Sequence, residues 1–334
     1  MENQSSDVPF SPLRVAVVGV GNFGRLHAKH YAQNKNAELV AVVDTVAEAA
    51  DAVAREFGCA ALYDHRDLIG KVDAASVVVP TSSHFDIANA LLDAGIDALV
   101  EKPLTDTISS ADALMRLADR DGRILQVGHI ERFSSCFRVL TDRVRNPLYF
   151  ESYRIAPWKE RNLDTDVIFD LMIHDIDIIL GLAGSDVVDV SAVGTRLFSD
   201  KVDLANARLT FASGCVANIT ASRVSHKVER SLRVFQPASY VVCDFVTRRI
   251  LTFRMSGEVG KSGMDAVVGE VTEAPREDSL ANEIDAFLSC VRHRARPTVD
   301  GRAGLEAVTI AQKVNDSIQQ HLANANALGS SKTR

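Results

Sequence analysis

One glycine-rich segment constrains the fold of this chain more than any other feature. The motif GVGNFG, residues 19–24, stands directly between an apolar β-branched run, residues 14–18, and a predicted helix. In that setting the first glycine permits a tight turn and the second lets the backbone approach a pyrophosphate. The third lets the helix pack closely on the strand. The motif therefore predicts a Rossmann-type dinucleotide site at the start of a parallel sheet.

A carboxylate at the end of the next predicted strand supports this site. Asp44 follows the last glycine of the motif by 20 residues and ends the segment ELVAVVD. A carboxylate at that position binds the adenine-ribose hydroxyls. Its charge would repel a 2′-phosphate, and the next residue is Thr45 rather than an arginine. The pair therefore favours NAD over NADP as the cofactor.

The rest of the chain separates into two patterns. Up to residue 130, β-branched runs alternate with helical stretches, which predicts an α/β domain with a doubly wound parallel sheet. The expected helices of this part are residues 26–34, 46–57, 84–93 and 109–120. From residue 131 on, period-2 alternation predicts an α+β domain with a large, mostly antiparallel sheet. Its strands, for example residues 206–211, are expected to present an apolar outer face.

Three helices are expected in the second part of the chain, at residues 167–183, 279–293 and 302–322. We therefore predict a flexible tail at residues 1–12, a Rossmann NAD-binding domain at 13–130, and an α+β domain at 131–334, which by resemblance to a known family would be the substrate and oligomerisation domain. The C-terminal helices are candidates for packing back on the first domain.

Composition excludes several classes of protein. The net charge is −7, from 37 basic and 44 acidic residues, and no basic run of five occurs, so a nucleic-acid partner is not expected. No apolar run approaches the roughly 20 residues needed to cross a bilayer, and the opening residues show no signal-peptide pattern. We expect a cytoplasmic protein without membrane contact. Its five scattered cysteines are expected to be reduced core residues: Cys59, Cys136, Cys215, Cys243 and Cys290.

A lysine at the end of a predicted strand is the first candidate for chemistry. Glu101-Lys102-Pro103 ends the strand-like segment DALVEKP. Because ligands of open α/β sheets bind beyond the carboxyl ends of the strands, Lys102 is expected in the crevice that holds the nicotinamide. Its ammonium would hydrogen-bond a substrate hydroxyl and stabilise the oxygen as it becomes negative. The alternative is an ordinary surface lysine.

A polar stripe on an otherwise apolar helix is the second candidate. Asp170, His174 and Asp177 stand at i, i+4 and i+7. A histidine can take a hydroxyl proton near neutral pH, and an aspartate one turn away can orient it. Two other interpretations stay open: a hydrogen-bonded core histidine, or a metal site using Asp170 and His174.

Together these elements resemble the Gfo/Idh/MocA family of NAD(P)-dependent oxidoreductases over residues 13–325. That family pairs a Rossmann domain with an α+β substrate domain. The resemblance implies that Lys102 and His174 are catalytic, with Asp170 in the same helix motif, and that no metal is used. It implies cofactor contacts from Gly19, Gly21, Asn22, Phe23, Gly24, Asp44, Thr45, Pro80, Thr81, His84, Glu101, Lys102 and His129. One departure is the stretch DVIF at 166–169, where the family often has a glycine pair.

Two phrases resemble one subgroup of the family more narrowly. VGHIERF at 127–133 and DLMIHDID at 170–177 are similar to enzymes that oxidise the 3-hydroxyl of UDP-N-acetylglucosamine, a step toward the 3-amino sugar of some lipid A molecules. This resemblance implies NAD as the hydride acceptor and a downstream aminotransferase that consumes the ketone. The substrate-binding set is then Lys102, Arg154, Trp158, Arg161 and His174, with Arg223, Arg230 and Arg233 in reserve.

The roles within that set have alternatives. Arginines are suited to a diphosphate, and Trp158 suits stacking on uracil or lining the nicotinamide pocket. The competing interpretation makes the cations surface residues and Trp158 a core residue.

Other functions also stay open. An inositol or another free sugar as substrate would need no diphosphate clamp, and aldehyde or biliverdin reduction is a minor possibility. A non-catalytic NAD-binding regulator is expected to lack Lys102 or His174, and both are present. Because the family's sheet commonly packs against another subunit, a homodimer or homotetramer is expected.

Overall fold

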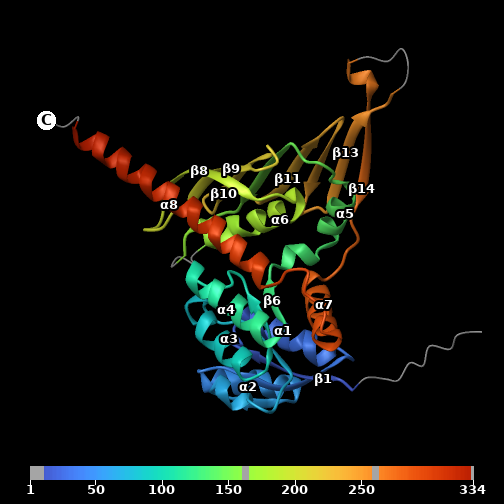
Figure 1. The fold of residues 1–334 in the computed structure, drawn as a ribbon, viewed down its shortest axis with the longest axis vertical. Coiled ribbons are helices and arrows are strands. Elements are labelled where there is room, and N and C mark those ends of the chain that lie inside the picture. The colour runs from blue at the N-terminus through green and yellow to red at the C-terminus, as the bar shows by residue number, and fades with distance from the viewer. Residues whose placement is uncertain (1–10, 160–164, 258–262, 332–334) are drawn as a thin grey trace, which may run out of the picture. The chain divides into compact units, whose positions relative to one another are not determined.

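The computed structural model describes residues 11–159, 165–257 and 263–331 (Figure 1). Its internal contacts divide the chain into two compact units. The first comprises the residues up to Gly128 together with Leu280–Leu305, and the second comprises His129–Ser279 and the residues from Glu306 on. The expected tail at 1–12 lies almost wholly outside the described residues.

A six-stranded parallel sheet forms the centre of the first unit. Its strand order is β3-β2-β1-β4-β5-β6, which is the Rossmann order. The strands are β1 Leu13–Val18, β2 Ala37–Val43, β3 Ala60–Leu62, β4 Ala74–Val77, β5 Asp97–Glu101 and β6 Leu125–Gly128. Four of them, β1, β4, β5 and β6, have runs of at least four consecutive buried residues, because helices cover both faces of such a sheet. The predicted doubly wound sheet is confirmed, and β3 is a strand of it that was not predicted.

The helices of this unit lie close to their predicted positions. They are α1 Asn22–Gln33, α2 Ala47–Phe57, α3 His84–Asp93, α4 Ile108–Asp121 and α7 Ser279–His293. Helix α1 packs with α2, and α3 packs with α4. Helix α7 returns from far along the chain: the Asp285 carboxylate accepts a 2.6 Å hydrogen bond from Asn34 at the end of α1, and the Glu283 carbonyl accepts one from Gln126 of β6. Helix α7 is therefore held against both α1 and β6.

An eight-stranded sheet forms the centre of the second unit, in the order β14-β13-β12-β11-β7-β10-β9-β8. Its strands are β7 Tyr149–Ile155, β8 Val187–Thr195, β9 Leu204–Phe211, β10 Val216–Ser222, β11 Glu229–Gln236, β12 Ser239–Asp244, β13 Arg249–Met255 and β14 Val267–Glu273. All neighbours are antiparallel except β7 and β10, which pair in parallel. The sheet is therefore mostly antiparallel, as predicted.

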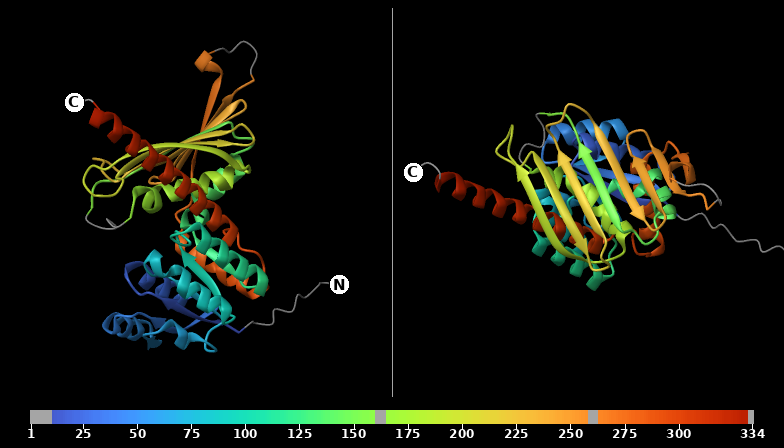
Figure 2. Two further views of the ribbon diagram at one scale, coloured as in Figure 1. Left: turned by 60° about the vertical axis from the view of Figure 1, so that its left-hand side comes forward. Right: turned by 90° about the horizontal axis from the view of Figure 1, so that it is seen from above.

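One face of this sheet is covered by helices and the other is open (Figure 2). Helices α5 Ser135–Arg143 and α6 Ile173–Ala183, with α8 Gly301–Ser331 from Glu306 on, contribute apolar residues to one core with alternate residues of the strands. Although α8 is long, no helix in the described part of the chain combines enough length with enough hydropathy to cross a membrane.

The open face corrects one expectation. In residues 206–211 the alternate residues Asn206, Arg208 and Thr210 are the more exposed ones, so the outer face of β9 is polar rather than apolar. The aromatic side chains of this sheet lie elsewhere. A row of half-buried rings crosses four strands, with neighbouring centroids 4.6–5.7 Å apart. Its members, from β7 to β13, are Tyr149, Phe235, Tyr240 and Phe253.

The predicted helix at 167–183 begins with a π-helical turn. Ile168–Met172 form that turn and α6 continues from Ile173, so Asp170 lies in the π turn and His174 in the first turn of α6. The start of the segment is bound to the residues just before β9, because Val167 donates to the Val202 carbonyl and Val202 donates to the Asp166 carboxylate. Such π turns occur frequently at functional sites.

A buried carboxylate organises the chain just before β9. Asp203 accepts hydrogen bonds from the backbone N–H groups of Leu197, Phe198 and Ser199 and from the Arg223 guanidinium. Burial alone would raise the pKa of Asp203. The Ser199 hydroxyl, the backbone N–H groups and Arg223 outweigh burial and hold the pKa of Asp203 below its usual range.

We predict that Asp203→Asn removes part of the acid sensitivity of the fold. Because the pKa of Asp203 is lower in the folded than in the unfolded chain, its contribution to stability is complete above the unfolded pKa, about 3.9, and is lost as the pH falls through the folded value. Urea unfolding at pH 7, 5 and 3 should show a lower free energy of unfolding for the variant at pH 7. The loss on acidification should be smaller than in the wild type. Parallel curves for the two proteins would contradict this assignment.

Candidate active site

The three glycines of the dinucleotide motif each meet a different steric demand. Gly19 has φ +88°, in the left-handed region that favours glycine, and a Cβ there would overlap the Val78 carbonyl. A Cβ on Gly24 would overlap the Gly19 carbonyl oxygen, so α1 begins in direct contact with the turn that precedes it. A Cβ on Gly21 would meet nothing within 4 Å, so this position faces open space. The predicted roles of turn, close packing and open approach are therefore all present.

The carboxylate of Asp44 fixes the same loop from the neighbouring strand. It accepts a 2.9 Å hydrogen bond from the Val20 N–H and another from the Val46 N–H. The Asp44 carboxylate therefore holds the backbone in two places, once in the glycine loop and once at the start of α2.

A cavity of about 670 Å³ lies along this loop at the carboxyl ends of the first-unit strands. Five of the predicted cofactor residues line it: Gly19, Gly21, Asp44, Thr45 and Pro80. The residues present fit NAD, because the cavity offers backbone N–H groups at a helix start for a pyrophosphate and a carboxylate for a ribose. The lining also contains residues that were not predicted: Tyr63, Asp64 and His65, which follow the three-residue strand β3, and Ser83 and Ile87.

Several predicted cofactor residues lie around the cavity lining rather than in it. Asn22 and Phe23 are exposed in the first turn of α1, and Thr81 begins a short 3-10 turn before α3. His84 is buried, and its two ring nitrogens each lie 2.9 Å from a carbonyl oxygen, one of Val79 and one of Pro103. His84 therefore braces the segment after β4 against the segment after β5.

Lys102 follows directly on β5 and is partly buried. Its backbone N–H donates a 3.2 Å hydrogen bond to the carboxylate of Glu101. That carboxylate lies over Gly128 of β6, where a Cβ would come within 2.6 Å of it. Glu101 is thus an internal residue that holds the lysine backbone, and it does not line the cavity.

In the second unit, an aspartate of α6 binds an arginine that was predicted to bind substrate. Asp175 is buried and accepts a 2.7 Å hydrogen bond from Nε of Arg154, whose Nη1 donates to Glu131 at 2.9 Å. Arg154 was predicted to bind substrate, but its guanidinium is buried in this ion pair. Breaking a buried pair by removing one partner typically costs about 3–5 kcal/mol, so this contact holds α6 firmly against β7.

A second buried contact lies on the same helix. Arg132 donates to the Asp177 carboxylate and to the Asp177 carbonyl, both at 3.2 Å, and Nδ1 of the buried His129 lies 4.0 Å from the same carboxylate. Gly181 makes this possible, because a Cβ there would overlap the Arg132 guanidinium. Asp177 is therefore bound in the interior, while His174 and Asp170 stay partly exposed. The phrases at 127–133 and 170–177 contact each other directly.

Trp158 is half-buried and lies beside the side chains of Phe198 and Arg223. Its ring meets that of the exposed Phe198 edge-on at 5.5 Å, and the Arg223 guanidinium lies 5.9 Å from its ring centroid. Arg223 is bound to Asp203. Arg161 lies outside the described residues.

The two other reserve arginines are separated by the sheet. Arg233 pairs with Glu151 on the open face. Arg230 is exposed at the position opposite Arg154.

We predict opposite outcomes for alanine at two of the loop glycines. Gly24→Ala should lower the free energy of unfolding by about 1–3 kcal/mol or more, because the new methyl group overlaps backbone. Gly21→Ala should leave that free energy unchanged and weaken NAD binding by about tenfold or more, because the methyl group enters only the space that a pyrophosphate would approach. Urea unfolding and calorimetric titration with NAD measure the two effects. Equal destabilisation by both variants would refute this division of roles.

Comparison with known proteins agrees with the geometry of both units. A family model described as an oxidoreductase family with an NAD-binding Rossmann fold matches residues 13–129, and a model described as the GFO/IDH/MocA C-terminal domain matches residues 134–238. The scyllo-inositol 2-dehydrogenase (NAD(+)) of Bacillus subtilis is 33% identical over 233 residues, which cover 64% of this chain and 68% of that protein.

A relative of higher identity spans nearly the whole chain. The UDP-N-acetylglucosamine 3-dehydrogenase of Acidithiobacillus ferrooxidans is 39% identical over 312 residues, 93% of this chain and 98% of that protein. A solved structure of UDP-N-acetylglucosamine 3-dehydrogenase GnnA from the same organism aligns with a TM-score of 0.87 at 37% identity, covering 93% and 99% of the two chains. This chain therefore belongs to the Gfo/Idh/MocA family of oxidoreductases with an NAD-binding Rossmann fold.

Proposed function

We propose that this protein oxidises the 3-hydroxyl of UDP-N-acetylglucosamine to the 3-ketone, with NAD as hydride acceptor. The observation that carries the proposal is the 39% identity to the Acidithiobacillus ferrooxidans enzyme of that name over 93% of this chain. That identity extends across both units, so it includes the second unit, where the subgroup phrase around His174 is bound to the interior at Asp175 and Asp177.

Two residues carry the chemistry in this proposal. When bound, NAD accepts the hydride that leaves C3 of the sugar. His174 takes the proton of the 3-hydroxyl, and Asp170, one turn earlier, orients the imidazole. Lys102 donates a hydrogen bond to the same oxygen, which favours the negative charge that develops there as the hydride leaves. The hydroxyl thus loses one proton and one hydride and becomes a ketone.

The nucleotide is assigned to the aromatic surface of the second unit. Trp158 and Phe198 present two rings at right angles, one of them largely exposed, which suits stacking on uracil. Because Arg154 is bound by Asp175 and Glu131, we assign the diphosphate to Arg161 and to the exposed Arg230 instead.

The proposal extends to partners and location. The 3-ketone is the kind of product that an aminotransferase converts to a 3-amino sugar, which fits the 3-amino sugar of lipid A. We place this reaction in the cytoplasm. The row of half-buried aromatic rings on the open sheet face supports a homodimer or homotetramer, since packing a second copy there would bury that row.

We predict NADH formation with UDP-N-acetylglucosamine. The assay follows absorbance at 340 nm with NAD and a panel of UDP-N-acetylglucosamine, UDP-glucose, myo-inositol and scyllo-inositol. Because oxidation to a free ketone is energetically uphill, a ketone trap is included to draw the equilibrium forward. Among these four, UDP-N-acetylglucosamine should give the highest kcat/KM.

The panel also tests the strongest alternative. Several relatives of this chain are inositol dehydrogenases, including the Bacillus subtilis protein. Turnover of an inositol without turnover of the nucleotide sugar would contradict the proposed substrate while keeping the family. NADP in place of NAD should support a lower rate, because Asp44 places a negative charge in the cavity lining.

We predict that Lys102→Ala and His174→Ala each lower kcat by about 10² or more and leave NAD binding intact, because each residue acts on the substrate oxygen. Lys71→Ala and His226→Ala remove exposed residues of the same types and serve as matched controls. Steady-state kinetics with the nucleotide sugar and calorimetric titration with NAD measure both effects. Wild-type rates in either catalytic variant would refute its assigned role.

A further inference from the structure

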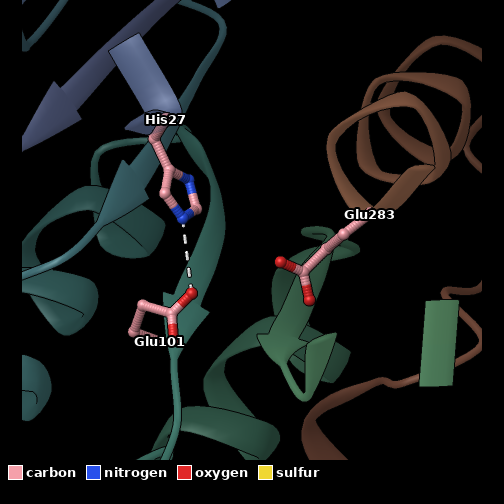
Figure 3. Close-up of side chains that lie close together, drawn as sticks. All are labelled: His27, Glu101 and Glu283. Carbon is pink, nitrogen blue, oxygen red and sulfur yellow. Dashed lines mark ion pairs between the residues drawn. The ribbon is translucent and has the colours of Figure 1, made fainter. Parts of the chain in front are cut away.

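Three titratable side chains of the first unit meet in its interior and have no part in the scheme above. They are His27 of α1, Glu101 of β5 and Glu283 of α7 (Figure 3). His27 and Glu283 are fully buried and Glu101 is 8% exposed. One ring nitrogen and one oxygen from each carboxylate lie within 4.8 Å of one another. Figure 3 shows the His27 ring directed at the Glu101 carboxylate, with the Glu283 carboxylate facing the pair from α7.

The contacts connect α1 to the backbone of Lys102. Nε2 of His27 lies 3.3 Å from Oε1 of Glu101, an ion-pair distance. The other oxygen of Glu101, Oε2, accepts the 3.2 Å hydrogen bond from the Lys102 N–H. A single carboxylate therefore stands between the imidazole and the backbone that presents the lysine.

The far side of the imidazole is also ordered. Nδ1 of His27 lies 3.1 Å from the Ser76 hydroxyl, which lies 2.8 Å from the Tyr31 hydroxyl. If Tyr31 donates to Ser76 and Ser76 donates to Nδ1, the ring carries its proton on Nε2, facing Glu101. The Nε2–H then faces Glu101 at the 3.3 Å ion-pair distance, although the contact does not have the geometry of a hydrogen bond.

The carboxylate needs such a donor because of its surroundings. Taking an ionised carboxylate out of water is expensive unless hydrogen bonds or opposite charge compensate it. The second carboxylate, Glu283, lies in the same small space, with one oxygen within 4.8 Å of both Glu101 and His27. Nε2 of His27 faces Oε1 of this carboxylate at 3.3 Å, while Oε2 accepts the hydrogen bond from the Lys102 N–H, so each oxygen of Glu101 has a nitrogen beside it.

We propose that His27 is a positioning residue for Lys102. It holds the Glu101 carboxylate in the orientation in which that carboxylate binds the Lys102 backbone. Since His27 stands on α1 three residues after Gly24, the helix that opens at the pyrophosphate loop is linked through two side chains to the proposed reacting lysine. This inference rests on the role proposed for Lys102.

Substitutions at His27 separate this role from simple filling of the core. His27→Gln keeps an N–H donor near the position of Nε2, whereas His27→Asn places its amide near Nδ1 and His27→Leu has no donor. We expect Leu and Asn to lower kcat by about tenfold or more and Gln to stay within about threefold of the wild type. The dissociation constant for NAD and KM for the nucleotide sugar should change little in all three. His226→Leu is the matched control, because it removes an exposed imidazole that lies outside this chain of contacts; its kcat should stay near wild type.

Three results would overturn the inference. The first is wild-type kcat in a folded His27→Leu or His27→Asn variant. The second is an equal loss in Gln and Asn, which a merely structural role would give; this comparison decides even where the Leu variant does not fold. The third is a stoichiometric metal in the purified protein by elemental analysis, since a cation would then replace the proton between these groups. Lys102→Ala, measured in the same assay, separates failure of the proposed function from failure of the positioning role. Wild-type kcat in Lys102→Ala would refute the proposed function. A lower kcat in Lys102→Ala together with wild-type kcat in the His27 variants would refute only the positioning role.

Discussion

The close approach of α1 to the turn before it is the constraint on which the first unit depends. Because residue 24 has no side chain, α1 starts against the Gly19 carbonyl, and the backbone at Gly21 stays open. Asp44 holds the Val20 amide in place from the neighbouring strand. One turn into the helix, His27 reaches Glu101 behind Lys102. The absence of a side chain at residue 24 thus determines the conformation of the cofactor loop. It also determines how close α1 lies to the end of β5, which carries the lysine.

Two buried arginine–aspartate contacts fix the orientation of α6 in the second unit. Arg154 binds Asp175 and Arg132 binds Asp177, and both aspartates follow His174 within three residues. Since both aspartates are buried, α6 has one favoured rotation about its axis, and that rotation leaves His174 partly exposed. The two phrases that distinguish the subgroup are therefore the two halves of one packing contact, which is a physical reason for them to occur together.

The sequence predicted elements whose signal is local. The glycine motif, the β-branched runs and the helices at 84–93 and 279–293 are found where they were expected. Strand β3 has three residues and is too short for a periodic pattern. The ion pair of Arg154 was not predicted, because nothing local shows that Asp175, 21 residues later, lies opposite it. The buried cluster of His27, Glu101 and Glu283 joins residues up to 256 positions apart and has no sequence signature. One local signal does exist: a charged residue on a nearly apolar helix, such as Asp175, indicates that a buried residue of opposite charge lies near it.

Isotope transfer from a labelled substrate tests the central claim most directly. UDP-N-acetylglucosamine carrying deuterium only at C3 is incubated with the protein, NAD and a ketone trap, and the reduced cofactor is examined by mass spectrometry. The account predicts that the deuterium appears in the reduced cofactor. Reduced cofactor that forms without deuterium, while the label stays in the sugar, would contradict oxidation at C3.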